Sequence, residues 1–430
     1  MNKNLARLIF EQGAKRRNPS LFRQYDELKQ SEWLGKEALH EVQLKNAAQF
    51  LRFAGKHSPY YRRLFAESSF DPKTFSDFDD LKVVPETSKG VLISENKAVH
   101  AQDFDELTRI AETSGTSGAA LEFRRNERWD SLNRASVMRA YDWYGVKPWD
   151  RNGYLWGYNI SSRQAVKVKL LDALQNRFRL FNYSVEEIGR FSHKLANASF
   201  LNGYSSMVYE IAKVINENNL ERPALKMVKG TSEMILDIYH RESLQAFGRK
   251  VTSEYGAAES GLIAFECPQG NMHINVENLF LETNDQGEAL VTNFASYSFP
   301  IIRYNLGDAV TLDNSLCECG RAHPLVKDIS GRKGAKVIGT TGTYPALTFY
   351  YVFKNLALQN NLLMSYKAVQ SEPGKVTLLI EDPANKKHEA AVQGELLRYF
   401  DGDIHFEIQY PDKFDATRKK RQYFESTLKS

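Results

Sequence analysis

The run Leu201-Asn202-Gly203-Tyr204-Ser205-Ser206 is the first of three strand-to-helix transitions on which the fold class depends. Its serines can cap a helix whose apolar residues follow at helical spacing, from Met207 to Ile215. Further strands are expected at 226–229 and 251–254. Strands about 25 residues apart with helices between them predict right-handed βαβ units and a largely parallel sheet. The loops 203–206, 230–233 and 255–260 then fall at the carboxyl ends of strands, where ligands bind in such sheets.

The regions on either side differ in character from this core. Residues 1–105 are expected to be a helical lead-in, with an amphipathic pattern over 38–65 that is interrupted at Pro59. Near the other end, strands expected at Lys375–Glu381 and 404–410 surround a helix at 386–400. We therefore predict an α/β fold with two domains. A large N-terminal domain, 1–331, has mixed or parallel sheets and flanking helices, and a small α+β C-terminal domain, 332–430, follows a hinge near Arg332.

The composition is that of a folded chain without an obvious charged or apolar specialisation. Lys and Arg number 57 against 53 Asp and Glu in 430 residues, so the net charge of +4 predicts no nucleic-acid partner. Apolar stretches fall short of the roughly 18 residues that a membrane span needs. Three cysteines cannot form a disulfide framework for a chain of this size. We expect a cytoplasmic enzyme.

A loop rich in glycine and hydroxyl groups, Thr113-Ser114-Gly115-Thr116-Ser117-Gly118, separates strands expected at Thr108–Glu112 and 121–124. Its glycines allow backbone N–H groups to converge on an anion, and the hydroxyls add further donors. The loop is not a Walker P-loop, because it lacks the lysine and opens onto a strand. The alternative is a solvated hairpin tip.

Two further segments carry carboxylates beside glycine turns. In Ser253-Glu254-Tyr255-Gly256-Ala257-Ala258-Glu259, a carboxylate follows a strand and a tight turn, which suits a Mg²⁺ ligand that bridges nucleotide phosphates. The alternative for Glu259 is a surface or helix-capping acid. In Ile301-Ile302-Arg303-Tyr304-Asn305-Leu306-Gly307-Asp308, the aspartate can accept two ribose hydroxyls, with Arg332 nearby in sequence. A structural ion pair is the alternative for the arginine and the aspartate.

In this order the three segments, followed by Gly331-Arg332, resemble those of the adenylate-forming superfamily. The branch they resemble most is that of the phenylacetate–coenzyme A ligases and their relatives in capsular-polysaccharide gene clusters. The resemblance extends from Pro59-Tyr60-Tyr61 to the C-terminal tail. It implies a large domain that makes an acyl-adenylate and a small mobile domain that rotates between two reaction steps.

The resemblance also implies roles for individual residues. The 113–118 loop would cradle the ATP phosphates, and Glu259 would hold Mg²⁺ as a catalytic residue. Asp308 would bind the ribose with help from Arg332, and Lys420, or alternatively Lys419, would be the adenylation lysine. The residues implied to border the nucleotide are Gly230, Ser232, Glu233, Tyr255 and Gly256. Those implied to line the acyl pocket are Trp156, Tyr204 and Tyr255. An aromatic strand such as that around Trp156 is more often part of a core.

The chain departs from the family pattern at three places. Ala119 and Ala120 stand where relatives usually have a lysine and a proline, which removes a cationic contact with phosphate. Lys333-Gly334 replaces acidic hinge residues, and no glycine precedes Lys420 in the basic tail. A solvated basic run is the alternative for that tail.

All three cysteines lie in two glycine-bearing turns, Cys267-Pro268-Gln269-Gly270-Asn271-Met272-His273 and Cys317-Glu318-Cys319-Gly320. Three thiolates and one imidazole complete a tetrahedral Zn²⁺ shell that is closed to water and therefore structural. The alternative is three reduced, buried cysteines and a surface histidine. Related aryl-ligase sequences have a similar pair of turns, which favours zinc at Cys267, His273, Cys317 and Cys319.

The predicted function is that of an ATP-dependent acid–thiol ligase. A carboxylate and ATP form an acyl-adenylate, and a thiol such as that of CoA then takes the acyl group. Transfer to a carrier protein or a sugar amine in surface-polysaccharide biosynthesis, or a nucleotide-binding homologue without catalysis, are the alternatives. The expected cofactors are ATP, Mg²⁺, structural Zn²⁺ and CoA, with a homodimer as the form common among relatives. The identity of the acid stays open, because the pocket lining cannot be identified from one sequence.

Overall fold

The structure of the chain is a computed structural model that describes residues 2–113, 121–155, 162–181, 183–332, 336–346, 348–381, 388–411, 414 and 422–428. The chain divides into two compact units, each built from segments that are not contiguous in sequence. Unit 1 contains residues 1–149 and 254–329, and unit 2 contains residues 150–253 and 330–430. Each unit is described by itself below. Within the described ranges, no helix has the length and apolar character needed to cross a membrane.

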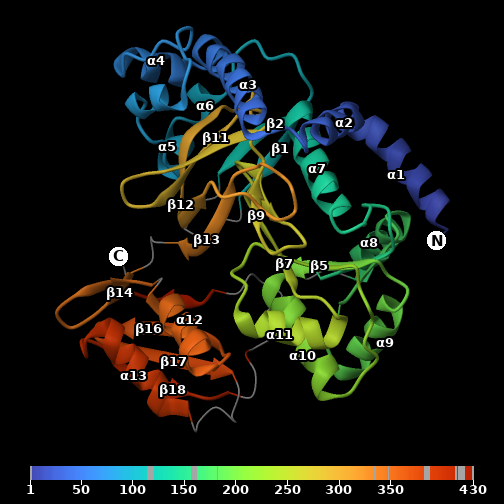
Figure 1. Cartoon of the computed structure of the whole chain (residues 1–430), viewed down its shortest axis with the longest axis vertical. Helices are drawn as coiled ribbons and strands as arrows, with labels where there is room; N and C mark the ends of the chain where they lie inside the picture. Colours follow the sequence, from blue (N-terminus) through green and yellow to red (C-terminus); the bar gives the residue numbers. More distant parts are fainter. Residues whose placement is uncertain are drawn as a thin grey trace. The chain divides into compact units, whose positions relative to one another are not determined.

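Unit 1 begins with helices and continues with antiparallel strands (Figure 1). Its helices are α1 Lys3–Arg17, α2 Leu21–Ser31, α3 Lys36–His57, α4 Pro59–Glu67, the 3₁₀ helix η1 Phe78–Val83, α5 Lys89–Ser94, α6 Asn96–Val99 and α7 Glu127–Asp142. Its strands are β1 Thr108–Glu112, β2 Glu122–Asn126, β7 Val251–Ala257 (whose first three residues belong to unit 2), β8 Gly261–Glu266, β9 Met272–Ile274, β10 Leu279–Thr283, β11 Glu288–Asn293, β12 Ile301–Asp313 and β13 Leu325–Arg332. The helical lead-in that the sequence predicts is thus present.

Pro59 both separates and initiates helices. The helix α3 ends at His57, and Pro59 occupies the first turn of α4, where its missing N–H costs no hydrogen bond. Ser58 is the N-cap, and its hydroxyl accepts a hydrogen bond from the Tyr61 N–H. The amphipathic pattern over 38–65 is therefore two helices with a break at the predicted place.

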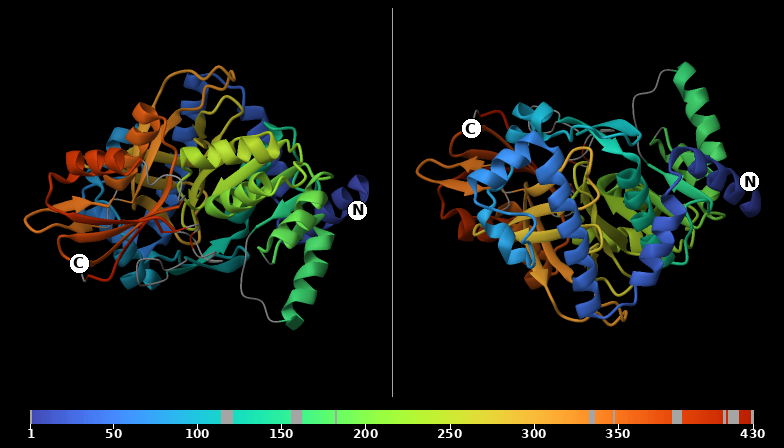
Figure 2. Two further views of the ribbon diagram at one scale, coloured as in Figure 1. Left: turned by 90° about the horizontal axis from the view of Figure 1, so that it is seen from below. Right: turned by 90° about the horizontal axis from the view of Figure 1, so that it is seen from above.

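The strands of unit 1 form a sheet and a separate hairpin. Hydrogen bonds connect the sheet in the order β10-β11-β12-β13-β9-β8-β7, and the pairs β10–β11, β11–β12, β13–β9, β8–β9 and β7–β8 are antiparallel. The strands β1 and β2 pair antiparallel with each other on either side of the 113–120 loop. The long helix α3 lies along the sheet (Figure 2), where the Gln43 side-chain amide donates to the Leu279 carbonyl.

Unit 2 contains the βαβ units that the sequence predicts. Its elements from the first segment are β3 Asn152–Tyr154, α8 Ser162–Leu174, β4 Arg177–Arg179, α9 Val185–Leu195, β5 Phe200–Tyr204, α10 Ser205–Glu217, β6 Met227–Thr231 and α11 Asp237–Phe247. The sheet runs β7-β6-β5-β3-β4, and the strand pairs β3–β4, β3–β5 and β5–β6 are parallel. Glycines allow close packing here, since a Cβ on Gly203 would lie 2.5 Å from Leu155 Cβ.

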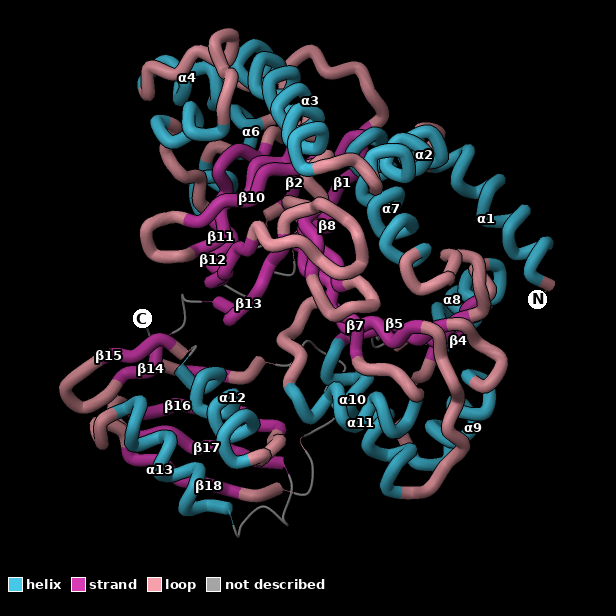
Figure 3. The backbone as a smooth tube through the Cα atoms, viewed as in Figure 1, coloured by secondary structure: helices cyan, strands magenta, loops and turns pink. Residues whose placement is uncertain are grey.

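The C-terminal segment of unit 2 carries its own small sheet. Its elements are β14 Lys336–Ile338, β15 Thr343–Pro345, α12 Thr348–Asn360, β16 Ser365–Glu372, β17 Lys375–Glu381, α13 Glu389–Phe400, β18 His405–Gln409 and β19 Phe424–Ser426. Strands are ordered β18-β17-β16-β19, and α12 and α13 cover one face of this sheet (Figure 3). The predicted fold class, α/β with a mixed sheet and a small α+β part at the C-terminus, is confirmed. The predicted division at 331/332 and its hinge stay predictions, and the chain passes from unit 1 to unit 2 at 329/330.

Candidate functional site

The turn between β7 and β8 is shaped by two glycines. A Cβ on Gly256 would lie 2.4 Å from the Gly261 carbonyl oxygen, so this strand pair closes only around a residue without a side chain. Gly261 has φ of 73°, in the left-handed region that favours glycine. The register shifts between Tyr255 and Gly256, which is a bulge of the kind that redirects side chains. The tight glycine turn expected from the sequence is present, and Glu259 lies within it.

The Glu259 carboxylate is buried and held in place. Its residue is 6% exposed, and the Tyr304 hydroxyl donates a hydrogen bond to Glu259 Oε1 at 3.0 Å. The backbone carbonyls of Glu259 and Ser260 both accept from the Asn293 side-chain amide, at 3.3 and 3.1 Å. Glu259 is therefore neither a surface acid nor a helix cap. It is a buried carboxylate in a fixed turn.

Asp308 is held in the same way from the opposite segment. The Tyr255 hydroxyl donates to Asp308 Oδ2 at 3.1 Å. The 253–261 segment and the 301–308 segment thus each contribute one carboxylate and one tyrosine, and each tyrosine binds the carboxylate of the other segment. Sequence reasoning identified Tyr255, Glu259 and Asp308 but missed Tyr304, although it lies inside the quoted RYNLGD run.

Arg303 stabilises the strands that carry the site. Its guanidinium forms a two-point ion pair with Glu282, with Nε–Oε1 at 2.9 Å and Nη2–Oε2 at 3.2 Å. A third hydrogen bond from Nη1 reaches the Val84 carbonyl. Its backbone has φ of 46°, its carbonyl accepts from the Thr87 N–H, and the Asn305 N–H donates to the Thr87 carbonyl. Arg303 therefore pairs with Glu282, and its ion pair supports β12 from β10.

Thr113 begins the glycine-rich loop and closes the β1–β2 hairpin. Its N–H donates to the Leu121 carbonyl at 3.0 Å, and its hydroxyl accepts from the Leu121 N–H at 2.9 Å. The rest of the predicted phosphate loop, Ser114, Gly115, Thr116, Ser117 and Gly118, lies outside the described residues. So do Trp156 and Lys420, and for Arg332 the description covers the backbone in β13 but not the side chain.

In unit 2, the predicted adenine-bordering residues gather at the carboxyl ends of β5 and β6. Gly203 and Tyr204 pair in register with Gly230 and Thr231, so Tyr204 and Gly230 lie at the same sheet edge. A Cβ on Gly230 would lie 2.6 Å from Ser205 Oγ, which requires a glycine at this position.

The next two predicted residues also have local structural roles. Ser232 has φ of 65°, which is uncommon outside glycine. The Glu233 carboxylate accepts from the Ser206 N–H at 2.8 Å and so caps the first turn of α10.

All three cysteines and His273 converge in unit 1. Their ligand atoms lie within 4.8 Å of one another, with Cys267 Sγ 3.7 Å from Cys317 Sγ and Cys319 Sγ 3.2 Å from His273 Nε2. Both turns end in glycines with positive φ, Gly270 at 82° and Gly320 at 84°. The grouping that the sequence predicts is therefore formed by the fold. Three of its members, Cys267, His273 and Cys317, are buried, and Cys319 is half-buried.

The chemistry of this donor set fits a metal ion. His273 Nδ1 lies 3.4 Å from the His323 carbonyl oxygen, which favours a proton on Nδ1 and a lone pair on Nε2, among the thiols. Burial raises the pKa of Cys267 to about 12, and burial followed by the nearby charge of His323 lowers the pKa of His273 to about 4. For Cys319, hydrogen bonds from Arg321 outweigh burial and lower the pKa of the thiol. A neutral imidazole beside three thiols is a donor set that Zn²⁺ prefers.

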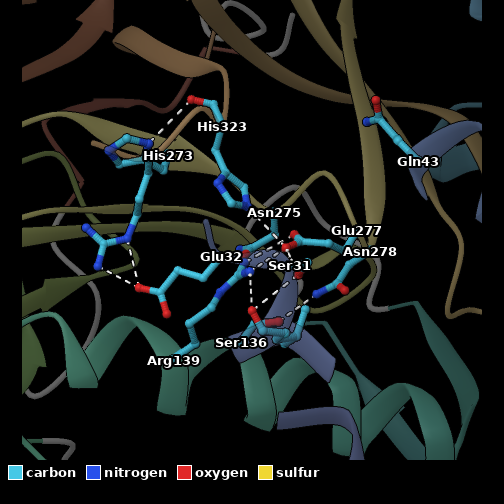
Figure 4. Close-up of polar contacts among 12 residues, drawn as sticks. Ser31, Glu32, Gln43, Ser136, Arg139, His273, Asn275, Glu277, Asn278 and His323 are labelled. Atoms are coloured by element: carbon cyan, nitrogen blue, oxygen red, sulfur yellow. Dashed lines mark hydrogen bonds and ion pairs between the residues drawn. The ribbon is translucent and has the colours of Figure 1, made fainter. Parts of the chain in front are cut away.

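A buried polar network lies behind the cysteine cluster (Figure 4). The Arg139 guanidinium pairs with the Glu277 carboxylate and donates to Asn275 Oδ1 at 2.6 Å. Ser31 and His323 also bind Glu277, at 2.6 and 3.1 Å. This network connects α2 and α7 to the β9–β10 connection and to the residues that follow Cys319.

A second ion pair connects the residues after the Cys317–Cys319 turn to the end of α2. The Arg321 guanidinium binds the buried Glu32 carboxylate, at 2.9 Å from Nε and 2.6 Å from Nη2. The same guanidinium stacks between the rings of Trp33 and Trp143, at 4.7 and 4.5 Å from their centroids. These contacts fix the Cys317–Cys319 turn from outside.

Two curated proteins are similar to the chain in sequence. "Protein CapK" from Staphylococcus aureus is 21% identical over 299 residues, which cover 65% of this chain and 64% of CapK. The match therefore spans less than two thirds of CapK's own length. Phenylacetate-coenzyme A ligase from Thermus thermophilus is 23% identical over 321 residues, which cover 70% of this chain and 72% of the ligase. No protein-family model matches the sequence.

Among solved structures, 2-hydroxyisobutyryl-CoA ligase shares the fold. Its postadenylation state in complex with R3-HIB-AMP matches with a TM-score of 0.72, over 93% of this chain and 91% of that one, at 16% identity. An open conformation of that ligase, in complex with 2-HIB-AMP and CoA, matches with a TM-score of 0.56 over 89% and 90% of the two chains. At this identity the likeness is one of fold. Together with the two sequence relatives, it makes the chain similar to phenylacetate-coenzyme A ligase and CapK, which bears out the resemblance drawn from the sequence.

Proposed function

We propose that the chain is an ATP-dependent ligase that activates a carboxylic acid as its acyl-adenylate and passes the acyl group to a thiol, that of CoA. The observation that carries this proposal is the crossed arrangement of Tyr255 with Asp308 and Tyr304 with Glu259. It fixes two carboxylates of different predicted roles within unit 1, each through a tyrosine of the other segment. The similarity to phenylacetate-coenzyme A ligase and the fold of 2-hydroxyisobutyryl-CoA ligase support the same reaction class.

In the first step, an oxygen of the substrate carboxylate attacks the α-phosphorus of ATP. The bond between the α-phosphorus and the oxygen that bridges to the β-phosphorus breaks, and pyrophosphate leaves. Asp308, held by Tyr255, accepts hydrogen bonds from the ribose hydroxyls and so orients the nucleotide. The 113–118 loop contributes donors to the phosphates, as predicted from the sequence.

Glu259 is the proposed ligand of Mg²⁺. A carboxylate oxygen is the type of donor that Mg²⁺ takes in nucleotide sites, and the Tyr304 hydroxyl holds this one in a fixed orientation. When bound, the ion would neutralise negative charge on the phosphates. The buried position of Glu259 strengthens any such charge interaction by keeping water away.

In the second step, the acceptor thiol attacks the carbonyl carbon of the mixed anhydride and AMP leaves. Lys420, with Lys419 as the alternative, is the proposed lysine for adenylation, and Arg332 the proposed ribose contact at the hinge. For Tyr204, Trp156 and Tyr255, the proposed role is the one that the sequence predicts, contact with the acyl group. Each of these assignments rests on the position of the residue in the family pattern.

The cysteine cluster is proposed to hold one structural Zn²⁺. Cys267, His273, Cys317 and Cys319 would supply the four protein ligands that Zn²⁺ takes in structural sites, so the ion would support the fold and take no part in the chemistry. It would join the turn after β8 to the turn before β13. Those strands flank the segments that carry Glu259 and Asp308.

The test is pyrophosphate release by the full chain with Mg-ATP, a panel of carboxylic acids and hydroxylamine as the acceptor. Acid-dependent release is expected, and Glu259→Gln should lower it by about a hundredfold or more, since a metal ligand is lost. Asp285→Asn is the matched control, because Asp285 is an exposed acid of unit 1 in the β10–β11 turn. Release that is equal in the two variants would contradict the role of Glu259.

The acceptor is tested in the same assay after adenylation is established. Replacing hydroxylamine with CoA should give an acyl thioester and free AMP. A carrier protein or an amino sugar that supports turnover where CoA does not would point to the alternative acceptors. ATP binding without any pyrophosphate release across the panel would favour the non-catalytic homologue, for which the Ala119-Ala120 substitution offers a reason.

A further inference from the structure

Three arginines of unit 1 surround one carboxylate, that of Asp130 in the first turn of α7, and a fourth, Arg109, lies next to one of them. Asp130 Oδ2 lies 2.9 Å from Arg134 Nε and 4.0 Å from Arg17 Nε, and Oδ1 lies 3.6 Å from Arg125 Nη1. Arg109 stands directly across from Arg125 in the β1–β2 hairpin, so the two side chains share a face. These residues come from four elements, α1, β1, β2 and α7, which unit 1 brings together (Figure 1).

The carboxylate is already satisfied without most of these cations. Arg134 is four residues from Asp130 on the same helix and forms an ordinary ion pair with it, and the Asn18 side-chain amide donates to Oδ2 at 2.9 Å. Glu127, the other acid of this first turn, accepts hydrogen bonds from Ser20 and Ser131. The positive charge of Arg17, Arg109 and Arg125 therefore exceeds the negative charge of the acids around them.

The mutual proximity of the guanidinium groups is unfavourable in itself. Burial, and then the charge of Arg134, lower the pKa of Arg17, with a further contribution from Arg109. For Arg125, burial again comes first, and Arg134 also opposes its charge. The charge of Asp130 acts in the opposite direction on both arginines, yet both pKa values stay lowered, so a further anion would stabilise the cluster.

Arg125 connects this cluster to the turn that carries Glu259. Its guanidinium donates to the Ala258 carbonyl at 2.5 Å and lies over the Trp129 ring at 5.0 Å. Its buried Nε has no hydrogen-bond partner among the described residues. It is placed six residues after Ala119, in the strand that leaves the glycine-rich loop.

We propose that Arg17, Arg109, Arg125 and Arg134 form a binding site for a phosphate-bearing anion. Guanidinium groups offer paired N–H donors that match phosphate oxygens, and several of them recognise a dianion better than a carboxylate. The anion is either the pyrophosphoryl part of a nucleotide or the phosphates of a nucleotide thiol such as CoA. The choice between these two sources rests on the proposed function, whereas the site itself does not.

The test is calorimetric binding of two probes to the full chain, inorganic pyrophosphate and adenosine 3′,5′-bisphosphate, at low and high salt. At least one probe should bind, more weakly at high salt. Arg17→Gln, Arg109→Gln and Arg134→Gln should each weaken binding about three- to tenfold. Arg128→Gln, an exposed arginine of α7 that makes no contact with Asp130 among the described residues, should leave it unchanged.

Asp130→Asn separates a binding site from a purely structural cluster. It removes the internal competitor for the four cations, so it should tighten binding of the probe by several-fold while lowering the melting temperature of the free chain. A cluster that only stabilises the fold would give the lower melting temperature without tighter binding. If the arginine variants lose affinity for pyrophosphate only, the site belongs to the nucleotide. If they lose affinity for the bisphosphate only, it belongs to the acceptor thiol.

Two results would overturn the proposal. One is that neither probe binds, and the other is that the arginine variants bind a probe as tightly as the unchanged chain. Because no carboxylic acid or turnover is needed, these results are independent of the ligase assay. Binding that is intact in a chain without pyrophosphate release would refute the proposed function and leave this site standing.

Discussion

At the scale of single residues, the two tyrosine–carboxylate contacts connect the fold to the proposed chemistry. A buried carboxylate without a hydrogen-bond donor would reorient or take up a proton, and either change would impair its use as a ligand. Tyr304 supplies the donor for Glu259, and Tyr255 supplies it for Asp308. Neither tyrosine need touch the reacting atoms in order to matter for the reaction.

Tyr304→Phe tests this positioning role. The variant keeps the ring and removes only the hydroxyl, so we expect the Mg²⁺ concentration needed for half-maximal pyrophosphate release to rise by about tenfold. Tyr255→Phe is the matched comparison, since its hydroxyl serves Asp308, and it should raise the KM for ATP with little effect on the Mg²⁺ requirement. Identical kinetic profiles for the two variants would contradict separate roles.

Glu277 allows a prediction of pH dependence. Burial alone would raise the pKa of this carboxyl, but the charges of Arg139 and His323 and their hydrogen bonds hold the pKa well below its usual range. A pKa lowered by folding means that the stabilisation is present above the ordinary carboxyl pKa of about 4.3 and is lost as the pH falls below it.

Glu277→Gln should therefore lower the free energy of unfolding by about 3–5 kcal/mol at neutral pH, because Arg139 is left buried without its partner. Urea unfolding of the unchanged chain should show stability that falls between about pH 5 and pH 3, and the variant should lose much of that slope. Asp285→Asn serves again as the control and should leave the slope as it is. An equal slope in Glu277→Gln would mean that other carboxyls dominate acid unfolding.

At the scale of elements, the β7–β8 pair depends on backbone proximity. Because a Cβ on Gly256 would lie 2.4 Å from a carbonyl oxygen, Gly256→Ala should destabilise the chain by about 1–3 kcal/mol in urea unfolding and reduce adenylation as the turn shifts. Gly13→Ala is the control, for which the free energy of unfolding should change in the opposite direction. Nothing lies within 4 Å of its added Cβ on α1, so it should stabilise by about 0.5–1 kcal/mol. Equal effects of the two changes would show that the close contact at Gly256 relaxes.

The two cysteine turns are the other element on which a prediction depends. Elemental analysis should find about one zinc per chain, and a strong chelator should lower the melting temperature and expose three thiols to a thiol reagent. Cys317→Ser should bind zinc more weakly and melt lower even before chelation. The zinc assignment would be wrong if the three thiols react fast without chelator and the melting temperature does not change when chelator is added. The cluster would then consist of buried cysteines only.

At the scale of the whole molecule, each unit has a hydrophobic core of its own. The core of unit 1 includes Phe50, Phe123 and Phe299, and that of unit 2 includes Val208, Tyr239 and Phe349. Zinc removal should therefore reduce hydrogen-exchange protection in β8, β9 and β13 while β5 and β6 keep theirs. Equal loss of protection in both units would show that their stabilities are coupled.

The βαβ half of the fold was predictable because its signals are local. Strand and helix periods, and serines or glycines at strand ends, predicted β5, β6, α11 and β17, the last at its observed bounds of Lys375–Glu381. The strands β10, β11 and β13 were not predicted, although β10 and β11 pair through a short turn. The strand β11 is buried on both faces, so it lacks the alternation of apolar and polar residues that is typical of a half-buried strand.

The site shows the same limit. The carboxylates and cysteines were found because their residue types are chemically distinctive and cluster in short runs. Their partners were missed: Tyr304, Asn293 and Arg125 are ordinary residues in sequence, and only the fold brings them to Glu259, Ser260 and Ala258. Contacts between residues tens of positions apart leave no local trace.

The crossed tyrosines also constrain how such a chain can change over generations. A substitution that removes the Glu259 carboxylate also removes the hydrogen bond that the buried Tyr304 hydroxyl donates to it, so the loss carries a penalty in folding as well as in activity. Drift at Asp308 has the same consequence for Tyr255. A descendant that abandoned catalysis would therefore be expected to exchange these residues in pairs, Glu259 with Tyr304 and Asp308 with Tyr255. This chain keeps both pairs intact.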